Sequence, residues 1–222
     1  MMKNIGSLCV GFALMISLNS SGQKTISEGT ITYNILIQSK KTENNVSNGL
    51  NGSTTSIYLK GNLSRIDMAS SLGNETTIYN AKNGTAVILK EYSGQKLMIS
   101  LTKENWDTRN KKFDGLTFEN TPEQKVIEGY KCRHAVAKLK DGSIISVFYT
   151  PDLVPANSDY NEAFKTLPGL PIEYDFETEK LTFKYHLSNI DFNTISLSKF
   201  EFPKSGYRVM TYDENKRNKA YD

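Results

Sequence analysis

Cysteine and histidine are scarce in this sequence, with two of each among 222 residues. Cys9 falls within an apolar stretch near the amino terminus, so a processed chain keeps only Cys132 and can form no internal disulfide. A zinc site needs three or four ligands, and His186 is the only imidazole besides His134. This scarcity excludes a disulfide-stapled scaffold and argues against a thiolate–imidazole centre.

An excess of charge of one sign is also missing. The chain has 27 Lys and Arg against 24 Asp and Glu, a net charge of +3, and so small a balance does not suggest a nucleic-acid partner. The basic clusters at residues 109–112 and 216–219 are interpreted as solvated turns and as part of a charged tail over residues 213–222.

Beyond the amino terminus no apolar run reaches the roughly 20 residues of a membrane-spanning helix, so we expect no transmembrane segment in the mature chain.

The amino terminus is the one long apolar run. Residues 1–4 are weakly basic, residues 5–18 are apolar without a charge, and residues 19–23 are small and polar. This order is typical of a secretory signal peptide. The alternative, a membrane anchor, would need a longer run, and Cys9 lies too early in it for a lipoprotein cysteine. We predict a signal peptide over residues 1–23, cleaved near Gly22 or Gln23, and hence an exported protein.

No constellation typical of an enzyme is present. Cys132 and His134 would point to the same side of a strand, with side chains about 6–7 Å apart at the base; an inert thiol beside a surface histidine is the alternative to half of a metal site. Glu173, Asp175 and Glu177 line one strand face, which suits a solvated face or a calcium ion. Neither a phosphate-binding glycine loop nor a nucleophile elbow occurs. We expect no enzyme, no metal and no cofactor.

Strand patterns dominate what is present. Apolar and polar residues alternate with period two over residues 31–37, 172–176 and 181–187, which is the pattern of strands with one buried face. Glycine- and asparagine-containing turns, including Asn83-Gly84 and Asp141-Gly142, separate shorter β-rich runs. These runs are residues 54–60, 63–68, 75–80, 85–90, 96–102, 116–119, 130–140 and 144–150. The pattern predicts one mainly β domain over residues 24–222, a curved antiparallel meander sheet or open half-barrel.

One short helix is expected over residues 159–166, with Asp159 as its cap and Glu162 at the capping-box position. It would direct Tyr160, Phe164 and Leu167 to one side, as a lid on the curved sheet. Residues 40–53, rich in Asn, Ser and Gly, are expected to form a flexible loop.

A corner is predicted where this helix meets the next strand. Pro168-Gly169 suits the centre of a type II turn with positive φ at the glycine. Leu167 and Leu170 flank it as buried apolar residues, and Pro171, which has no N–H for a ladder, marks the start of a strand. We interpret residues 167–171 as a fold-determining motif.

This motif resembles that of the GLPGLI family, exported Bacteroidetes proteins of unknown function, of the Porphyromonas type. Thr166 and Pro171 depart from the eponymous hexapeptide. Residues 28–33 resemble the family's opening strand, and residues 127–135 with 147–150 resemble its central segment. The resemblance implies an exported protein of a Gram-negative bacterium, located in the periplasm, at the outer membrane or outside the cell, and no known activity.

A weaker, fold-level likeness is to LolA-like periplasmic lipoprotein carriers, whose curved sheet closes around an apolar cavity. It implies a binding module for an apolar small molecule or lipid, with Tyr160, Phe164 and Leu167 as candidate ligand-binding residues. The alternative is a structural or interaction protein of the envelope whose core is filled.

Overall fold

The computed structural model describes residues 22–39 and 52–219. Most of these residues form one open sheet of twelve strands, in the order β14-β7-β6-β5-β4-β3-β2-β13-β12-β10-β9-β8. The strands are β2 (Glu28–Ser39), β3 (Ser53–Lys60), β4 (Leu63–Ser70), β5 (Gly73–Asn80), β6 (Thr85–Tyr92), β7 (Gln95–Leu101), β8 (Glu119–Ile127), β9 (Tyr130–Lys138), β10 (Ile144–Thr150), β12 (Leu170–Glu177), β13 (Leu181–Asp191) and β14 (Arg208–Thr211). A separate parallel pair joins β1 (Lys24–Ile26) to β11 (Leu153–Pro155). The predicted mainly β, curved, open sheet is confirmed.

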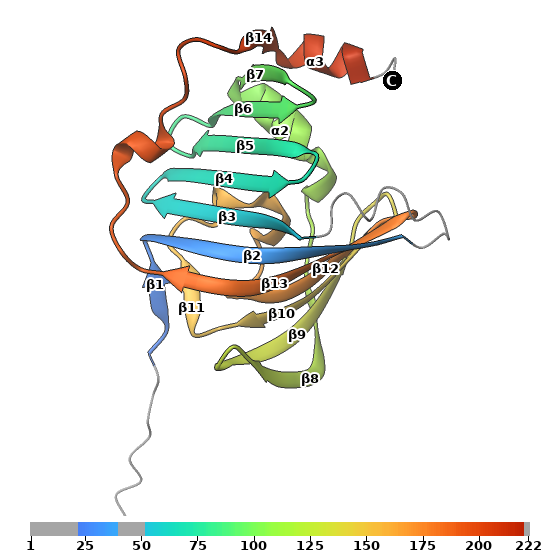
Figure 1. The fold of residues 1–222 in the computed structure, drawn as a ribbon. Helices are drawn as coiled ribbons and strands as arrows, with labels where there is room; N and C mark the ends of the chain where they lie inside the picture. The colour runs from blue at the N-terminus through green and yellow to red at the C-terminus, as the bar shows by residue number, and fades with distance from the viewer. Residues whose placement is uncertain (1–21, 40–51, 220–222) are drawn as a thin grey trace, which may run out of the picture.

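The sheet consists of two meanders rather than one. Strands β2 to β7 follow one another in space, and so do β8, β9, β10, β12 and β13. Antiparallel pairing of β2 with β13 joins the two, with Ile35 opposite Tyr185 and Ile37 opposite Phe183. In Figure 1, β3 to β7 stack on one side of β2, while β13 to β8 curve away on the other. A pairing across so much of the chain leaves no local pattern, which is why the sequence predicted a single meander.

Most predicted strands agree with the structure within a few residues, but the strand predicted at residues 116–119 is wrong. Leu116 is buried and lies before β8, which begins at Glu119. This strand forms one edge of the sheet, and its side chains are almost all polar and exposed. Pro122 falls in its register shift between Asn120 and Gln124. Such an irregular edge resists pairing with another chain. Strand β8 also lacks the alternation of apolar and polar residues from which a strand is predicted.

The helix predicted at residues 159–166 is also wrong. Two 3-10 turns stand there, η2 (Ser158–Tyr160) and η3 (Glu162–Phe164). Asn161 separates them with an extended backbone, and the Asn157 and Asn161 side chains, not Asp159, cap the two turns. Side-chain caps that compete with the helix backbone divide the segment into two single turns. We call residues 158–164 the lid.

Two α-helices occur where the sequence predicted none. Helix α2 (Lys103–Asn110) starts at a capping box between Thr102 and Asn105, and Trp106 is its one buried residue. Helix α3 (Tyr212–Lys219) occupies most of the predicted tail at residues 213–222. Both sequences are strongly polar, so neither shows the apolar 3.6-residue period that predicts a helix. Two short 3-10 turns, η1 (Lys111–Phe113) and η4 (Leu197–Phe200), complete the described elements.

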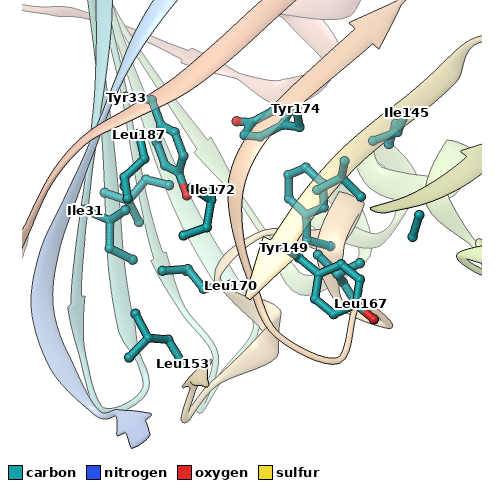
Figure 2. Close-up of a cluster of buried hydrophobic side chains, with 14 of the residues drawn as sticks. Ile31, Tyr33, Ile145, Tyr149, Leu153, Leu167, Leu170, Ile172, Tyr174 and Leu187 are labelled. Carbon is teal, nitrogen blue, oxygen red and sulfur yellow. The ribbon is translucent and has the colours of Figure 1, made fainter. Parts of the chain in front are cut away.

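The core forms on the face of the sheet that we call the inner face. Its larger cluster fills the space between β2, β10, β12 and the lid and includes the fully buried Ile31, Val147 and Ile172. Figure 2 shows Tyr33 and Leu187 beside Leu170 and Ile172, and the Tyr33 hydroxyl donates to the Pro171 carbonyl at 2.8 Å. A smaller cluster lies under α2, where Trp106 stacks on Tyr79 at 4.5 Å between ring centroids. The lid and α2 thus cover two parts of one face.

The motif at residues 167–171 is buried as expected, but the predicted type II turn is wrong. Leu167 and Leu170 are in the core, and Pro171 lies beside a register shift of β10, where a missing N–H is tolerated. Gly169, however, is not among the described glycines with positive φ. A Cβ on Gly169 would lie 2.8 Å from Tyr149 Cδ2 and 2.9 Å from the Thr150 carbonyl carbon, and closer still to its oxygen. The glycine is required by close approach to β10.

The carboxyl-terminal segment, residues 192–207, crosses the outer face of β4 to β6 and ends in β14. Arg65 donates to the Lys199 carbonyl at 3.0 Å, and the Tyr207 hydroxyl donates to Glu91. Burial and that carboxylate raise the pKa of Tyr207 to about 12, so the phenol keeps its proton at neutral pH. Strand β14 then pairs parallel with β7, and Met210 is buried in the smaller cluster.

The predicted signal peptide lies outside the described residues, except for Gly22 and Gln23. The predicted loop at residues 40–53 also lies outside them, except that Gly52 belongs to a turn and Ser53 begins β3. Within the described residues no helix has the length and apolar character to span a membrane.

Candidate functional site

The predicted ligand-binding residues lie inside the packed core. Tyr160, Phe164 and Leu167 are only 4%, 6% and 7% exposed. Phe164 packs edge-on against Tyr174, with 4.7 Å between ring centroids, and stacks on Phe118 at 6.0 Å. The lid side chains therefore fill the space below the lid, and their role in binding a ligand stays a prediction.

A hollow of about 220 Å³ lies next to this packed region, on the inner face of the sheet. Its floor is made of two cross-strand rows, one of Thr55, Met68 and Glu75 and one of Ile57, Ile66 and Thr77. Its wall is formed by Tyr174 and Tyr185, and the lid contributes Asn161. We call this space the inner hollow.

The aromatic wall of the inner hollow is rigid and uncharged. The rings of Tyr174 and Tyr185 stack at 4.3 Å with 10° between their planes, and Tyr33 meets Tyr174 edge-on at 5.6 Å. Burial raises the pKa of both Tyr174 and Tyr185, so neither phenol ionises near neutral pH. Stacked, fixed rings lose little entropy when they contact a ligand, so this wall suits an apolar group.

The opposite end of the inner hollow is charged. Glu75 Oε2 lies 3.2 Å from Lys90 Nζ, and Glu75 Oε1 lies 3.6 Å from Arg109 Nη2. Lys90 follows Glu75 in the same cross-strand row, on β6, and Arg109 comes from the last turn of α2. The sequence did not predict this group, because its three half-buried members lie on three separate elements and share no motif.

The outer face has two larger hollows. One of about 350 Å³ has Leu36 and Phe148 in its lining and is crossed by the Lys184–Asp175 ion pair at 2.7 Å. The other, about 460 Å³, lies under the carboxyl-terminal segment between charged residues such as Arg65 and Asp67. Each has charged side chains in its lining that already pair with one another, Lys184 with Asp175 and Arg65 with Asp67. The inner hollow differs from both in lying on the inner face, between the sheet, the tyrosine wall and Asn161 of the lid.

The histidines and strand carboxylates are bonded to other groups. His134 lies between the hydroxyls of Thr121 and Ser146, each 2.9 Å from a ring nitrogen. Glu173 binds Lys125 at 2.9 Å and His186 at 3.2 Å. In the described parts of the chain, no three His, Cys, Asp or Glu residues gather as metal ligands.

Cys132 is the one cysteine among the described residues; it is only 2% exposed, and its Sγ donates to the Tyr130 carbonyl at 3.4 Å. Burial raises the pKa of this thiol, which disfavours the reactive thiolate. We expect Cys132→Ser to lower the free energy of unfolding by about 1–2 kcal/mol, and the native thiol to react slowly with Ellman's reagent. Rapid labelling of the folded protein would contradict this assignment.

The fold and site define an open, strongly curved β-sheet domain with a partly covered inner face. The chain belongs to the DUF4412 family, a domain of unknown function, whose model matches residues 43–207. No curated protein matches the chain significantly. The more specific resemblance to the GLPGLI family stays a prediction.

Solved structures show similarity in fold only. The structure of PNGF-II matches with a TM-score of 0.51 and 14% identity, over 86% of this chain and 33% of that one. An uncharacterised conserved protein from Thermus thermophilus matches with a TM-score of 0.48 and 10% identity, over 84% and 91%. The MucA/MucB complex of Pseudomonas aeruginosa matches with 0.42 and 8%, over 79% and 56%. This chain spans about a third of the length of PNGF-II.

Proposed function

We propose that this protein is an exported, non-catalytic binding module that holds the apolar part of a small molecule or lipid in the inner hollow. The observation that carries the proposal is the hollow itself, a space of about 220 Å³ with Ile57, Ile66 and Met68 in its floor and two stacked tyrosines as its wall. Small-molecule sites are concave and largely pre-formed, with mostly apolar walls and a few polar groups. Export rests on the amino-terminal sequence, and a LolA-like carrier role rests on fold analogy.

A scaffold or interaction protein is the second candidate. It is favoured by the filled space beneath the lid, where Tyr160, Phe164 and Leu167 leave less room than the sequence predicted. A scaffold would gain stability from this packing and would bind no apolar probe in the inner hollow.

A substitution that fills the inner hollow distinguishes a binding module from a scaffold. N-phenyl-1-naphthylamine, a neutral apolar fluorophore, is titrated into the mature protein in the absence of detergent. Met68→Trp places a larger side chain in the hollow, and we expect it to weaken probe binding at least tenfold, about 1.4 kcal/mol. Leu36→Trp is the matched control, because Leu36 is 45% exposed and lines a hollow on the outer face.

The control variant is expected to bind the probe as the original protein does, and thermal melts show whether each variant is folded. Absence of probe binding, or equal binding by the folded Met68→Trp protein, would favour the scaffold.

A further inference from the structure

Glu75 lines the inner hollow, and Lys90 and Arg109 adjoin the hollow through their contacts with Glu75, so this end has more positive than negative charge. Glu75 is the carboxylate that contacts both Lys90 and Arg109, so two cations share one anion. Among the described ion pairs, the lid acids Asp159 and Glu162 contact Lys165, at 2.7 and 3.7 Å, and not Lys90 or Arg109. Burial also raises the pKa of Glu162, which opposes its negative charge.

Arg109 has hydrogen-bond donors that its contact with Glu75 does not use. Its Nη2 atom approaches Glu75 at 3.6 Å, beyond a normal hydrogen-bond distance, and its side chain is 33% exposed. A guanidinium has five donors in a planar fork that matches carboxylate and phosphate oxygens. Contact with Glu75 through one nitrogen at this distance leaves most of these donors available to a ligand.

Helix α2 holds Arg109 in place. The capping box at Thr102 fixes the start of the helix, and Trp106, one turn before Arg109, stacks on Tyr79 of β5 at 4.5 Å. The same strand carries Glu75. Arg109 is therefore presented by an anchored helix rather than by a loop, which reduces the entropy lost when it binds an anion.

We propose that the inner hollow takes an amphiphile with a single anionic headgroup, a carboxylate or phosphate, bound by Arg109 and Lys90. The apolar chain lies over Ile57, Ile66 and Met68 against the tyrosine wall. This inference rests on the proposed function and adds the chemical class of the ligand. A cationic headgroup is disfavoured, because Glu75, the carboxylate in the lining of the hollow, is already paired with two cations.

The test compares ligands that share one chain and differ in headgroup. Dodecanoate, dodecyl phosphate and uncharged dodecanol compete for the site with N-phenyl-1-naphthylamine, below their micelle-forming concentrations, at pH 8. We expect at least one anion to bind tenfold or more tightly than dodecanol. The anion that binds more tightly identifies a carboxylate or a phosphate source.

Three variants locate the headgroup. Arg109→Gln is expected to reduce the preference for the anion over dodecanol to less than threefold, and Arg109→Lys to restore part of it. Lys111→Gln removes an exposed charge two residues further on and is expected to leave the preference unchanged. Thermal melts check that all three variants are folded.

The outcomes separate this inference from the proposed function. Equal binding of the anions and dodecanol, or a preference that survives in folded Arg109→Gln, would overturn the anionic headgroup and leave the apolar site standing. Failure of every ligand and of the neutral probe to bind would overturn both.

Discussion

Gly169→Ala is expected to lower the free energy of unfolding by about 3 kcal/mol, the upper range for overpacking a tight interior. The added Cβ would overlap the Thr150 carbonyl and lie 2.8 Å from Tyr149 Cδ2. Both are parts of β10 in the core, so relief requires the backbone of two adjacent strands to separate. For a chain of this size the loss corresponds to a fall in Tm of roughly 6–12 °C. Thermal and denaturant unfolding measure it.

Gly94→Ala is the matched control. Gly94 has a φ of +77° and no atom within 4 Å of an added Cβ, so the same substitution costs only the left-handed backbone, about 1–2 kcal/mol. An asparagine at position 169 distinguishes a need for positive φ from the close approach of β10, because asparagine tolerates positive φ but is bulkier than alanine. We expect Gly169→Asn to be at least as destabilising as Gly169→Ala. A harmless Gly169→Asn would show that positive φ, and not close approach, requires the glycine.

Phe164→Ala is expected to lower the free energy of unfolding by about 3–5 kcal/mol, as for other buried aromatic truncations. Phe164 is 6% exposed and packs between Phe118 and Tyr174. The lid is too short to close around the lost ring, since each of its two turns has only three residues. Urea unfolding monitored by tyrosine fluorescence measures the change.

Phe202→Ala is the control of the same residue type. Phe202 is 47% exposed on the carboxyl-terminal segment, and surface substitutions of this kind usually change stability by less than about 0.5 kcal/mol. The comparison also tests the predicted ligand role of Phe164. Loss of probe binding with unchanged stability would mean that Phe164 serves a ligand rather than the core.

Most strands of the large sheet were predictable from the sequence because their signal is local. Alternation at residues 31–37 and 181–187 identifies β2 and β13 without any knowledge of their partners. The same residues do not say that β2 and β13 pair with each other, since any strand with one apolar face fits another. Edge strand β8 and helix α2 were missed because their residues face solvent and carry almost no apolar period.

The candidate site was harder to predict than the fold. The sequence predicted an apolar face beneath the segment around Tyr160 and Phe164, and core residues lie there, while a ligand role for these side chains stays a prediction. It could not show that these side chains fill their space, because filling depends on Phe118, Tyr174 and the curvature of the sheet. The inner hollow lies beside them, and Asn161 is its one contribution from the lid.

The amino-acid sequence alone established the mainly β class, most of the strands of the large sheet and the buried motif at residues 167–171, because each follows from neighbours along the chain. Tertiary structure decided the joining of two meanders through β2 and β13, and the reason for the glycine at position 169. It also decided the meeting of Glu75, Lys90 and Arg109. These depend on distances between residues that are remote in sequence, and such distances arise only when the sheet curves and its inner face is covered.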